Sequence, residues 1–206
     1  MTETAPSRSP KRLVSLDALR GFTIAAMVIV NDPGSWEHVY PPLRHAEWNG
    51  CTLTDLIFPF FLFIVGISIA LAYTKRMEAG VPTGRIYRKI VIRSVNIYLL
   101  GLFLWLWPDF DFTAIRWVGV LQRIAVVFLV CALLFLNTSW KQQVWIGSTV
   151  LVLYWIVVAY VPVPGVGTPD LSEPGKNWAN YLDTLILPGV MWQGTWDPEG
   201  ILSTFP

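Results

Sequence analysis

The chain has 206 residues, of which 54% are hydrophobic and only 14% are charged, and its mean hydropathy is +0.51. A soluble domain is usually about 25% charged, so this composition excludes an ordinary soluble protein and indicates an integral membrane protein. The formal net charge of +1 argues against nucleic acid as a partner.

Five apolar segments are long enough to cross a membrane as helices, which rise about 1.5 Å per residue. The predicted spans are 13–30, 53–73, 90–107, 114–136 and 144–161. Residues 1–12 are polar and are expected to form a disordered cytoplasmic tail, whereas 162–206 is rich in Pro, Gly and acid and is expected to be an external loop. The expected fold class is therefore an all-α, polytopic integral membrane protein with about five transmembrane helices.

The first predicted span is only marginally long, and Ser15 is its predicted N-cap. Asp17 and Arg20 lie three residues apart, which places them on one helix face as a predicted ion pair. The uninterrupted apolar part, 21–30, covers about 15 Å, roughly half a bilayer. We therefore expect the helix to end early and to leave Asn31 below the membrane surface.

The distribution of basic residues predicts the orientation. One side of the predicted topology contains Arg8, Lys11, Arg12, Lys75, Arg76, Arg85, Arg88, Lys89 and Lys141, and the other side has a surplus of acids. Because cytoplasmic loops are enriched in Lys and Arg, the N-terminus is predicted to be cytoplasmic and the loop 31–51 external. The Asn-x-Ser/Thr match at Asn137 falls on the cytoplasmic side, which is consistent with a bacterial inner membrane.

Polar residues around the start of the second span are the first candidates for chemistry. His45 can exchange a proton near neutral pH or act as a nucleophile, although an interfacial histidine can also simply hydrogen-bond within a loop. Asp55 could orient His45, or could be a helix N-terminal acid stabilised by the helix dipole. Asn31 could donate to a developing oxyanion or merely cap the first helix. His38 lies mid-loop and is assigned no role.

Arginines in the later spans are the next candidates. Arg123 lies too deep in its span to snorkel easily, so it is expected to face a cavity or a partner. Together with Arg116 it could line a path for an anionic ligand, and the alternative is a structural ion pair with Asp55 or Asp17. Arg93 is close enough to the cytoplasmic side to snorkel and is assigned no function. No Gly-rich nucleotide loop and no Cys–His metal spacing are present in the sequence, so no metal is expected.

Several motifs resemble, in order, those of the heparan-α-glucosaminide N-acetyltransferase-like family of membrane acyltransferases, specifically its bacterial branch. The matching stretches are SLDALRGF at 15–22, ND at 31–32, HAEWNG at 45–50, TLTDLIFPFFLFIVG at 52–66, RWVGVLQR at 116–123, VPVPG at 161–165, YLDTLILPG at 181–189 and WDPEGILST at 196–204. The block HAEWNG followed by TDLIFPFF is the most specific part of this resemblance.

The resemblance implies transfer of an acetyl group from cytoplasmic acetyl-CoA to an amine of an amino-sugar or glycan acceptor on the external side. It implies catalytic roles for His45, Asp55 and Asn31. It further implies an acyl-CoA path along Arg20, Gln122 and Arg123, and acceptor binding by Trp48 and Asn49. It does not decide between an acetyl-histidine intermediate and direct transfer.

Members of the family continue past the last motif with roughly as many spanning helices again, so this chain resembles the N-terminal half. The alternatives from other functional classes are an amino-sugar transporter and a non-catalytic membrane subunit. The expected partners are the lipid bilayer and the acceptor, with a homodimer as an open alternative and no nucleic acid. The expected location is a bacterial inner membrane.

Overall fold

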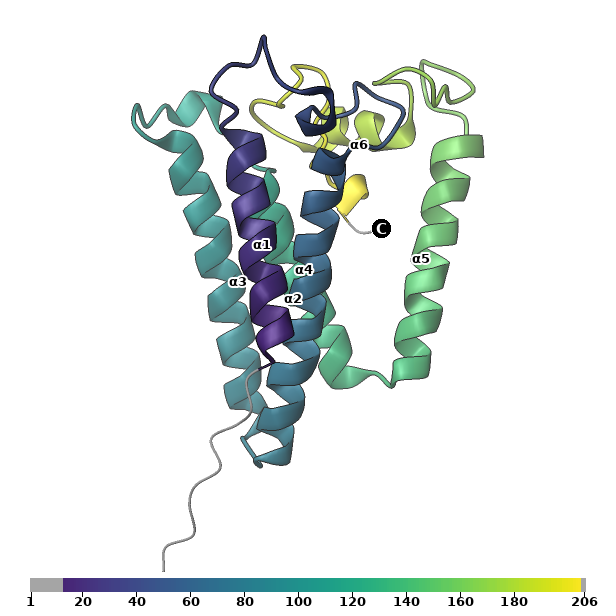
Figure 1. Cartoon of the computed structure of the whole chain (residues 1–206). Coiled ribbons are helices and arrows are strands. Elements are labelled where there is room, and N and C mark those ends of the chain that lie inside the picture. The colour runs from purple at the N-terminus through teal and green to yellow at the C-terminus, as the bar shows by residue number, and fades with distance from the viewer. Residues whose placement is uncertain (1–12, 205–206) are drawn as a thin grey trace, which may run out of the picture. The chain divides into compact units, whose positions relative to one another are not determined.

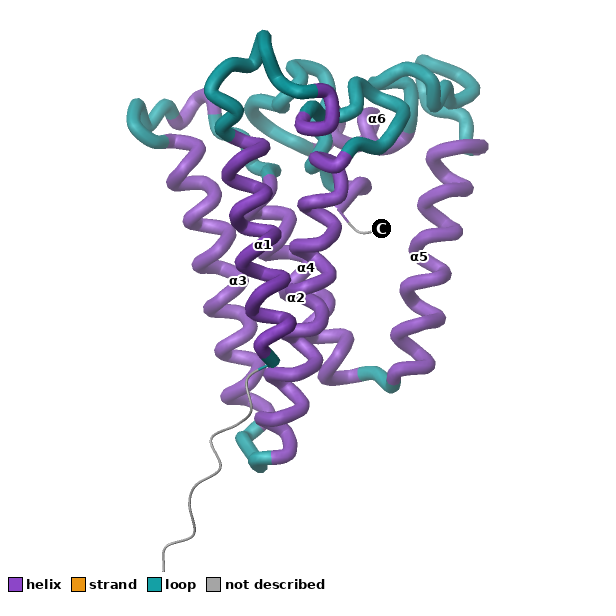
Figure 2. The backbone as a smooth tube through the Cα atoms, in the orientation of Figure 1, coloured by secondary structure: helices purple, strands orange, loops and turns teal. Residues whose placement is uncertain are grey.

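The computed structural model describes residues 13–204, and over these residues the regular structure is helical, with two isolated β-bridges and no strand (Figures 1 and 2). The helices are α1 (Val14–Asn31), α2 (Leu53–Glu78), α3 (Thr83–Leu106), α4 (Val120–Asn137), α5 (Trp140–Tyr160) and α6 (Trp178–Ile186), with 3₁₀ turns η1 (Pro41–Leu43), η2 (Phe112–Ala114) and η3 (Leu202–Thr204). Helices α1 to α5 are long and apolar enough to cross a membrane. The all-α, five-span prediction is confirmed, and the predicted tail 1–12 lies outside the described residues.

Two local predictions need correction. Ser15 is not the N-cap of the first helix, because helical geometry begins at Val14 and Leu13 occupies the cap position without a side-chain hydrogen bond. The stretch 162–206 is not only a loop, because it contains α6. That helix begins where the Asn177 side chain accepts hydrogen bonds from the backbone N–H groups of Ala179 and Asn180, which satisfies donors that a helix start otherwise leaves unpaired.

The fourth helix begins later than the start of the predicted span at residue 114. Gly119 is extended, with φ 164°, and the helix starts at the next residue, Val120. The preceding Arg116 forms an isolated antiparallel bridge with Gly189. This backbone pairing holds the segment before α4 in an extended conformation, and an extended segment cannot form part of the helix.

The chain divides into two compact units, one up to Ile64 and one from Val65 onward. The first unit contains α1, the loop 32–52 and the first turns of α2. The second contains the rest of α2 and everything after it. The core of the second unit is formed by Ile69, Tyr73, Ile86, Ile90, Phe128 and Ala132. These residues come from α2, α3 and α4, so burial of their side chains packs the three helices together.

Helices α3 and α4 are also joined by polar contacts. The Ser94 hydroxyl donates to the Ala125 carbonyl oxygen at 2.8 Å, and this contact is buried. Gly101 permits a close approach, because a Cβ at that position would lie 2.6 Å from Oε1 of Gln122. By contrast, α5 buries none of its residues within the described structure, as expected of a helix whose apolar surface faces lipid.

Candidate active site

The first unit brings together two of the predicted catalytic residues. His45 lies in the loop before α2, and Asp55 lies in the first turn of α2. Nδ1 of His45 is 2.7 Å from Oδ1 of Asp55. Since an ionised carboxylate only accepts hydrogen bonds, this contact requires the proton of the imidazole to be on Nδ1.

The Asp55 carboxylate is held by the start of its own helix. Its Oδ2 accepts hydrogen bonds from the backbone N–H groups of Thr52 (2.9 Å) and Ala46 (3.2 Å). Thr52 directly precedes the first helical residue, so the pair T-x-x-D resembles a capping box, in which an acidic side chain reaches back to the N-cap backbone. The same carboxylate therefore stabilises the helix N-terminus and positions His45.

The loop that contains His45 has further ties to α2. The Thr52 hydroxyl lies 2.6 Å from the Arg44 carbonyl oxygen, and the buried Thr54 hydroxyl donates to the Pro42 carbonyl oxygen at 3.4 Å. These contacts flank His45 and fix its backbone against the helix. The His45 side chain is nevertheless 67% exposed, whereas that of Asp55 is 26% exposed. The imidazole is thus anchored on its Nδ1 side and leaves Nε2 as the basic nitrogen for a reacting group.

The other residues predicted around this centre lie in α1 and in the loop that follows His45. The Asn31 amide donates to the Met27 carbonyl oxygen at 2.9 Å, at the last residue of α1, which is the capping arrangement that the sequence left open. Trp48 is half-buried and Asn49 is exposed, in the loop that follows His45. Arg20 forms the predicted ion pair with Asp17 at 3.3 Å, and this prediction is confirmed.

A second polar cluster lies in the second unit, around Arg116. Its guanidinium donates to both oxygens of Asp197, at 2.7 and 2.6 Å, and also to Glu199. The indole rings of Trp105 and Trp192 lie 5.7 and 5.1 Å from the guanidinium carbon. The structural ion pair, one of the two alternatives from the sequence, is confirmed for Arg116. Its partners are Asp197 and Glu199, 81 and 83 residues later in the chain, and not Asp55 or Asp17.

The ionisation of this cluster follows from its burial and its pairing. Burial alone would lower the pKa of Arg116 and raise that of Asp197, but their mutual hydrogen bonds and opposite charges outweigh burial. The pKa of Arg116 is therefore raised and that of Asp197 is lowered. For Glu199 burial dominates and raises the pKa. A charged Arg116–Asp197 pair thus forms the centre of the cluster.

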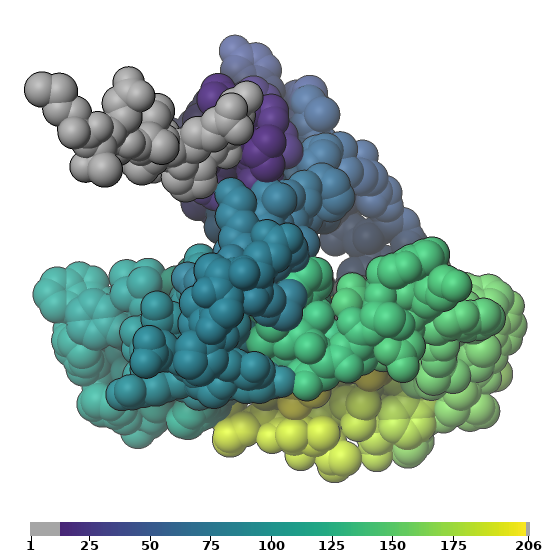
Figure 3. Space-filling view, turned by 90° about the horizontal axis from the view of Figure 1, so that it is seen from below, coloured from purple at the N-terminus to yellow at the C-terminus, as the bar shows by residue number. Residues whose placement is uncertain are grey.

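At the start of α4, Gln122 is buried and Arg123 is half-buried. The Gln122 side chain lies against Gly101 of α3. One terminal nitrogen of Arg123 donates to the backbone carbonyl oxygen of Ser203, near the end of the described chain. Figure 3 shows this final segment, in yellow, beside the green helices α4 and α5. Both side chains thus tie α4 to other parts of the second unit.

Sequence reasoning missed Asp183 of α6, whose side chain is among the most completely buried in the described structure. Its Oδ1 accepts a hydrogen bond from the Ile201 backbone N–H at 2.8 Å. A Cβ added to Gly200 would lie only 1.8 Å from Oδ2, so only glycine fits there. Burial raises the pKa of Asp183 to about 6. The spacing of the acid within YLDTLI gave no signal, because its surroundings come from the distant 200–201 segment.

Comparisons with known proteins identify the family of this chain. The family model described as heparan-alpha-glucosaminide N-acetyltransferase, catalytic, matches residues 12–197. The chain belongs to the heparan-alpha-glucosaminide N-acetyltransferase family. The match includes the His45–Asp55 pair and, in the second cluster, both Arg116 and Asp197.

Two curated relatives in this family carry the name heparan-alpha-glucosaminide N-acetyltransferase. The one from Homo sapiens is 31% identical over 96% of this chain, and the one from Mus musculus is 29% identical over 95% of it. Each alignment covers 37% of the relative. The chain therefore spans little more than a third of the length of the relatives it matches.

Proposed function

We propose that this chain provides the histidine centre of a multi-pass membrane acetyltransferase that transfers an acetyl group from acetyl-CoA to an amine of an amino-sugar acceptor. The observation that supports this most directly is the His45–Asp55 hydrogen bond of 2.7 Å together with the exposure of the imidazole. The family to which the chain belongs supports the reaction class, and the names of the relatives indicate a glucosaminide amine.

The chemistry of the centre follows from the position of the proton on the imidazole. Asp55 holds the Nδ1–H, so the lone pair on Nε2 of His45 is available. In a covalent route, Nε2 attacks the thioester carbonyl, the carbon–sulfur bond breaks, and the thiolate of CoA leaves. The acceptor amine then attacks the acetyl-imidazole, the bond between the acetyl carbon and Nε2 breaks, and the freed Nε2 takes the proton that the amine loses. In a direct route, Nε2 removes a proton from the amine as that amine attacks the thioester, the carbon–sulfur bond breaks, and the thiolate of CoA leaves.

The remaining predicted roles belong to the same proposal. Asn31 would stabilise the oxyanion, and Trp48 and Asn49 would contact the acceptor. Arg20, which is partly exposed, would attract the phosphates of acetyl-CoA. Gln122 is buried and Arg123 is half-buried, so we propose that they position α4 along the acyl-CoA path. Acetyl-CoA would enter from the cytoplasmic side of a bacterial inner membrane, and the acceptor would bind on the external side.

The test is the variant His45→Ala in the complete gene product, assayed for acetyl transfer from labelled acetyl-CoA to glucosamine. We expect a loss of at least about 100-fold in turnover, since the nucleophile or general base is gone. His38→Ala is the matched control, because it removes the other histidine of the same loop, also exposed, and should leave turnover nearly unchanged. Near-normal turnover by His45→Ala would overturn the proposal.

Two further measurements separate the routes and the function classes. Incubation with acetyl-CoA alone, followed by peptide mass spectrometry, should detect acetylated His45 if the route is covalent and should not if transfer is direct. Uptake of labelled glucosamine into vesicles that lack acetyl-CoA would instead indicate a transporter.

A further inference from the structure

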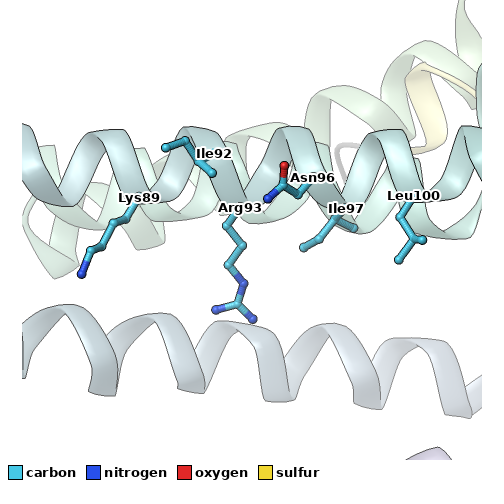
Figure 4. Close-up of a pocket in the computed structure, with 6 residues that line it drawn as sticks. All are labelled: Lys89, Ile92, Arg93, Asn96, Ile97 and Leu100. Carbon is cyan, nitrogen blue, oxygen red and sulfur yellow. The ribbon is translucent and has the colours of Figure 1, made fainter.

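A groove of about 340 Å³ runs along one side of α3, and none of its lining residues is assigned above to acetyl transfer. It is lined by Lys89, Ile92, Arg93, Asn96, Ile97 and Leu100 (Figure 4). Residues three, four, seven and eight positions apart share a helix face, so these side chains form one continuous strip. Figure 4 shows Lys89, Arg93, Ile97 and Leu100 extending from the same side of the helix.

The strip is polar at one end and apolar at the other. The polar residues Lys89, Arg93 and Asn96, with Ile92 among them, lie nearer the turn between α2 and α3 than Ile97 and Leu100 do. At 1.5 Å per residue, the distance from Lys89 to Leu100 is about 16 Å. This order matches an amphiphile with an anionic head and a hydrocarbon tail.

The two cations of the strip are available to a ligand. Over residues 13–204, neither Lys89 nor Arg93 forms an ion pair with a carboxylate, and both side chains belong to exposed residues. The Arg93 guanidinium carbon lies 4.9 Å from the centre of the Phe128 ring, which fixes where this charge sits. Arg93 is also about 15 Å along α3 from Thr83. A cation at that depth is expensive unless it has an anionic partner or reaches the interface.

We propose that the α3 groove binds an anionic phospholipid, with the phosphate at Lys89, Arg93 and Asn96 and an acyl chain along Ile97 and Leu100. Clusters of basic residues at the cytoplasmic ends of transmembrane helices favour anionic headgroups. The two cations and the Asn96 amide can bind a single phosphodiester, and the apolar part of the strip can contact one acyl chain.

Acyl-CoA is the other amphiphile to consider, and the lining fits it less well. None of the lining residues is aromatic, so none can stack an adenine ring. Acyl-CoA has a diphosphate and a separate phosphate, and the groove has only two cations to pair with both. The lipid site does not depend on the proposed acetyl transfer, and its test does not use activity.

The experiment compares two double variants that remove the same charge from the same helix. Lys89→Gln/Arg93→Gln changes the groove. Arg85→Gln/Arg88→Gln is the matched control, because both residues are exposed on α3 but do not line the groove. Each protein is titrated with phosphatidylglycerol in neutral detergent, and lipid adducts are counted by native mass spectrometry. Size-exclusion chromatography and the thermal midpoint confirm that each variant is folded.

We expect the groove variant to bind phosphatidylglycerol about tenfold to thirtyfold more weakly than the unchanged protein, since each basic residue contributes about a factor of five. The control variant should bind nearly normally. Phosphatidylcholine should not compete, and glycerol phosphate, which has the head without a tail, should bind only weakly. An equal loss in both variants would overturn the proposal, as would displacement of the lipid by coenzyme A.

Discussion

Asp55 is the residue on which the local structure and the proposed chemistry both depend. Its two oxygens accept from the Thr52 and Ala46 backbone and from His45, so the carboxylate has a hydrogen-bond donor on each side. A carboxylate can accept all of these bonds, whereas an amide presents one acceptor oxygen and one NH₂ donor.

The variant Asp55→Asn tests this dependence. An amide NH₂ would have to face the N–H groups of Thr52 and Ala46, or else lose the bond to Nδ1 of His45. We expect kcat for acetyl transfer in the complete gene product to fall about 10²-fold to 10⁴-fold, as when the orienting acid of a triad is neutralised. KM should change much less, because the substrate does not contact Asp55 in the proposal. An unchanged kcat would remove Asp55 from the mechanism.

The raised pKa of Asp183 predicts that the stability of the protein depends on pH. Its folded pKa of about 6 lies above the ordinary value of 3.8, so the folded state takes up a proton that the unfolded chain does not take up until lower pH. The contribution of this group to stability therefore increases as pH falls through 6. Glu199, whose pKa is also raised, contributes with the same sign, whereas the lowered pKa of Asp197 acts only at more acidic pH.

The measurement for Asp183 is the thermal midpoint in detergent at pH 7 and at pH 5. The unchanged protein should gain about 1 kcal/mol from this group over that interval. Asp183→Asn keeps the acceptor for the Ile201 N–H and should lose most of the pH dependence. The same slope in the variant and in the unchanged protein would mean that Asp183 is not the titrating group.

At the scale of elements, the Arg116 cluster joins the segment before α4 to the chain near its described end. Asp197 also accepts from the Trp192 backbone N–H at 3.0 Å, so the carboxylate organises its own loop as well as binding the arginine. The side chains of Arg116 and Asp197 are 9% and 0% exposed. At this degree of burial, removal of one partner leaves an uncompensated charge away from water.

The variant Arg116→Met should therefore lower the free energy of unfolding by about 3 kcal/mol or more. The double variant Arg116→Met/Asp197→Leu should recover part of that loss, because it removes the more deeply buried of the two carboxylates that lose their arginine. Thermal midpoints of the two variants in the same detergent provide the comparison. If the double variant is no more stable than the single one, the loss comes from packing against Trp105 and Trp192, and not from the unpaired charge.

The orientation of the whole molecule in the membrane can be measured by labelling its cysteines. Cys51 is exposed in the loop before α2, and Cys131 lies within α4, one of the five candidate spans. The charge distribution predicts that Cys51 faces the exterior. Cys131 should be shielded by hydrocarbon from a charged reagent.

A membrane-impermeant maleimide applied to intact cells should therefore label the unchanged protein and should not label Cys51→Ser. Labelling that appears only after the membrane is permeabilised would reverse the predicted orientation, and with it the sidedness of the proposed reaction.

Much of the local structure could be predicted from the sequence by itself. The apolar segments predicted the helical class and the five spans, because a helix that crosses a membrane requires a continuous run of apolar residues, which is a local feature of the sequence. The Asp17–Arg20 pair followed from helix periodicity. The proximity of His45 to Asp55 was predictable because T-x-x-D marks a helix start, and only a short loop separates it from the histidine.

Only the tertiary structure decided which distant groups meet. Arg116 was expected to line a path for an anionic ligand or to form an ion pair. Its partners Asp197 and Glu199 are separated from it by most of the second unit, and no local pattern encodes that pairing. The burial of Asp183 and the α3 groove around Arg93 were missed for the same reason. Helix periodicity defines which residues share a face. What covers that face depends on the packing of other helices and loops, and for a buried charge this packing determines whether it is paired, neutral or available to a ligand.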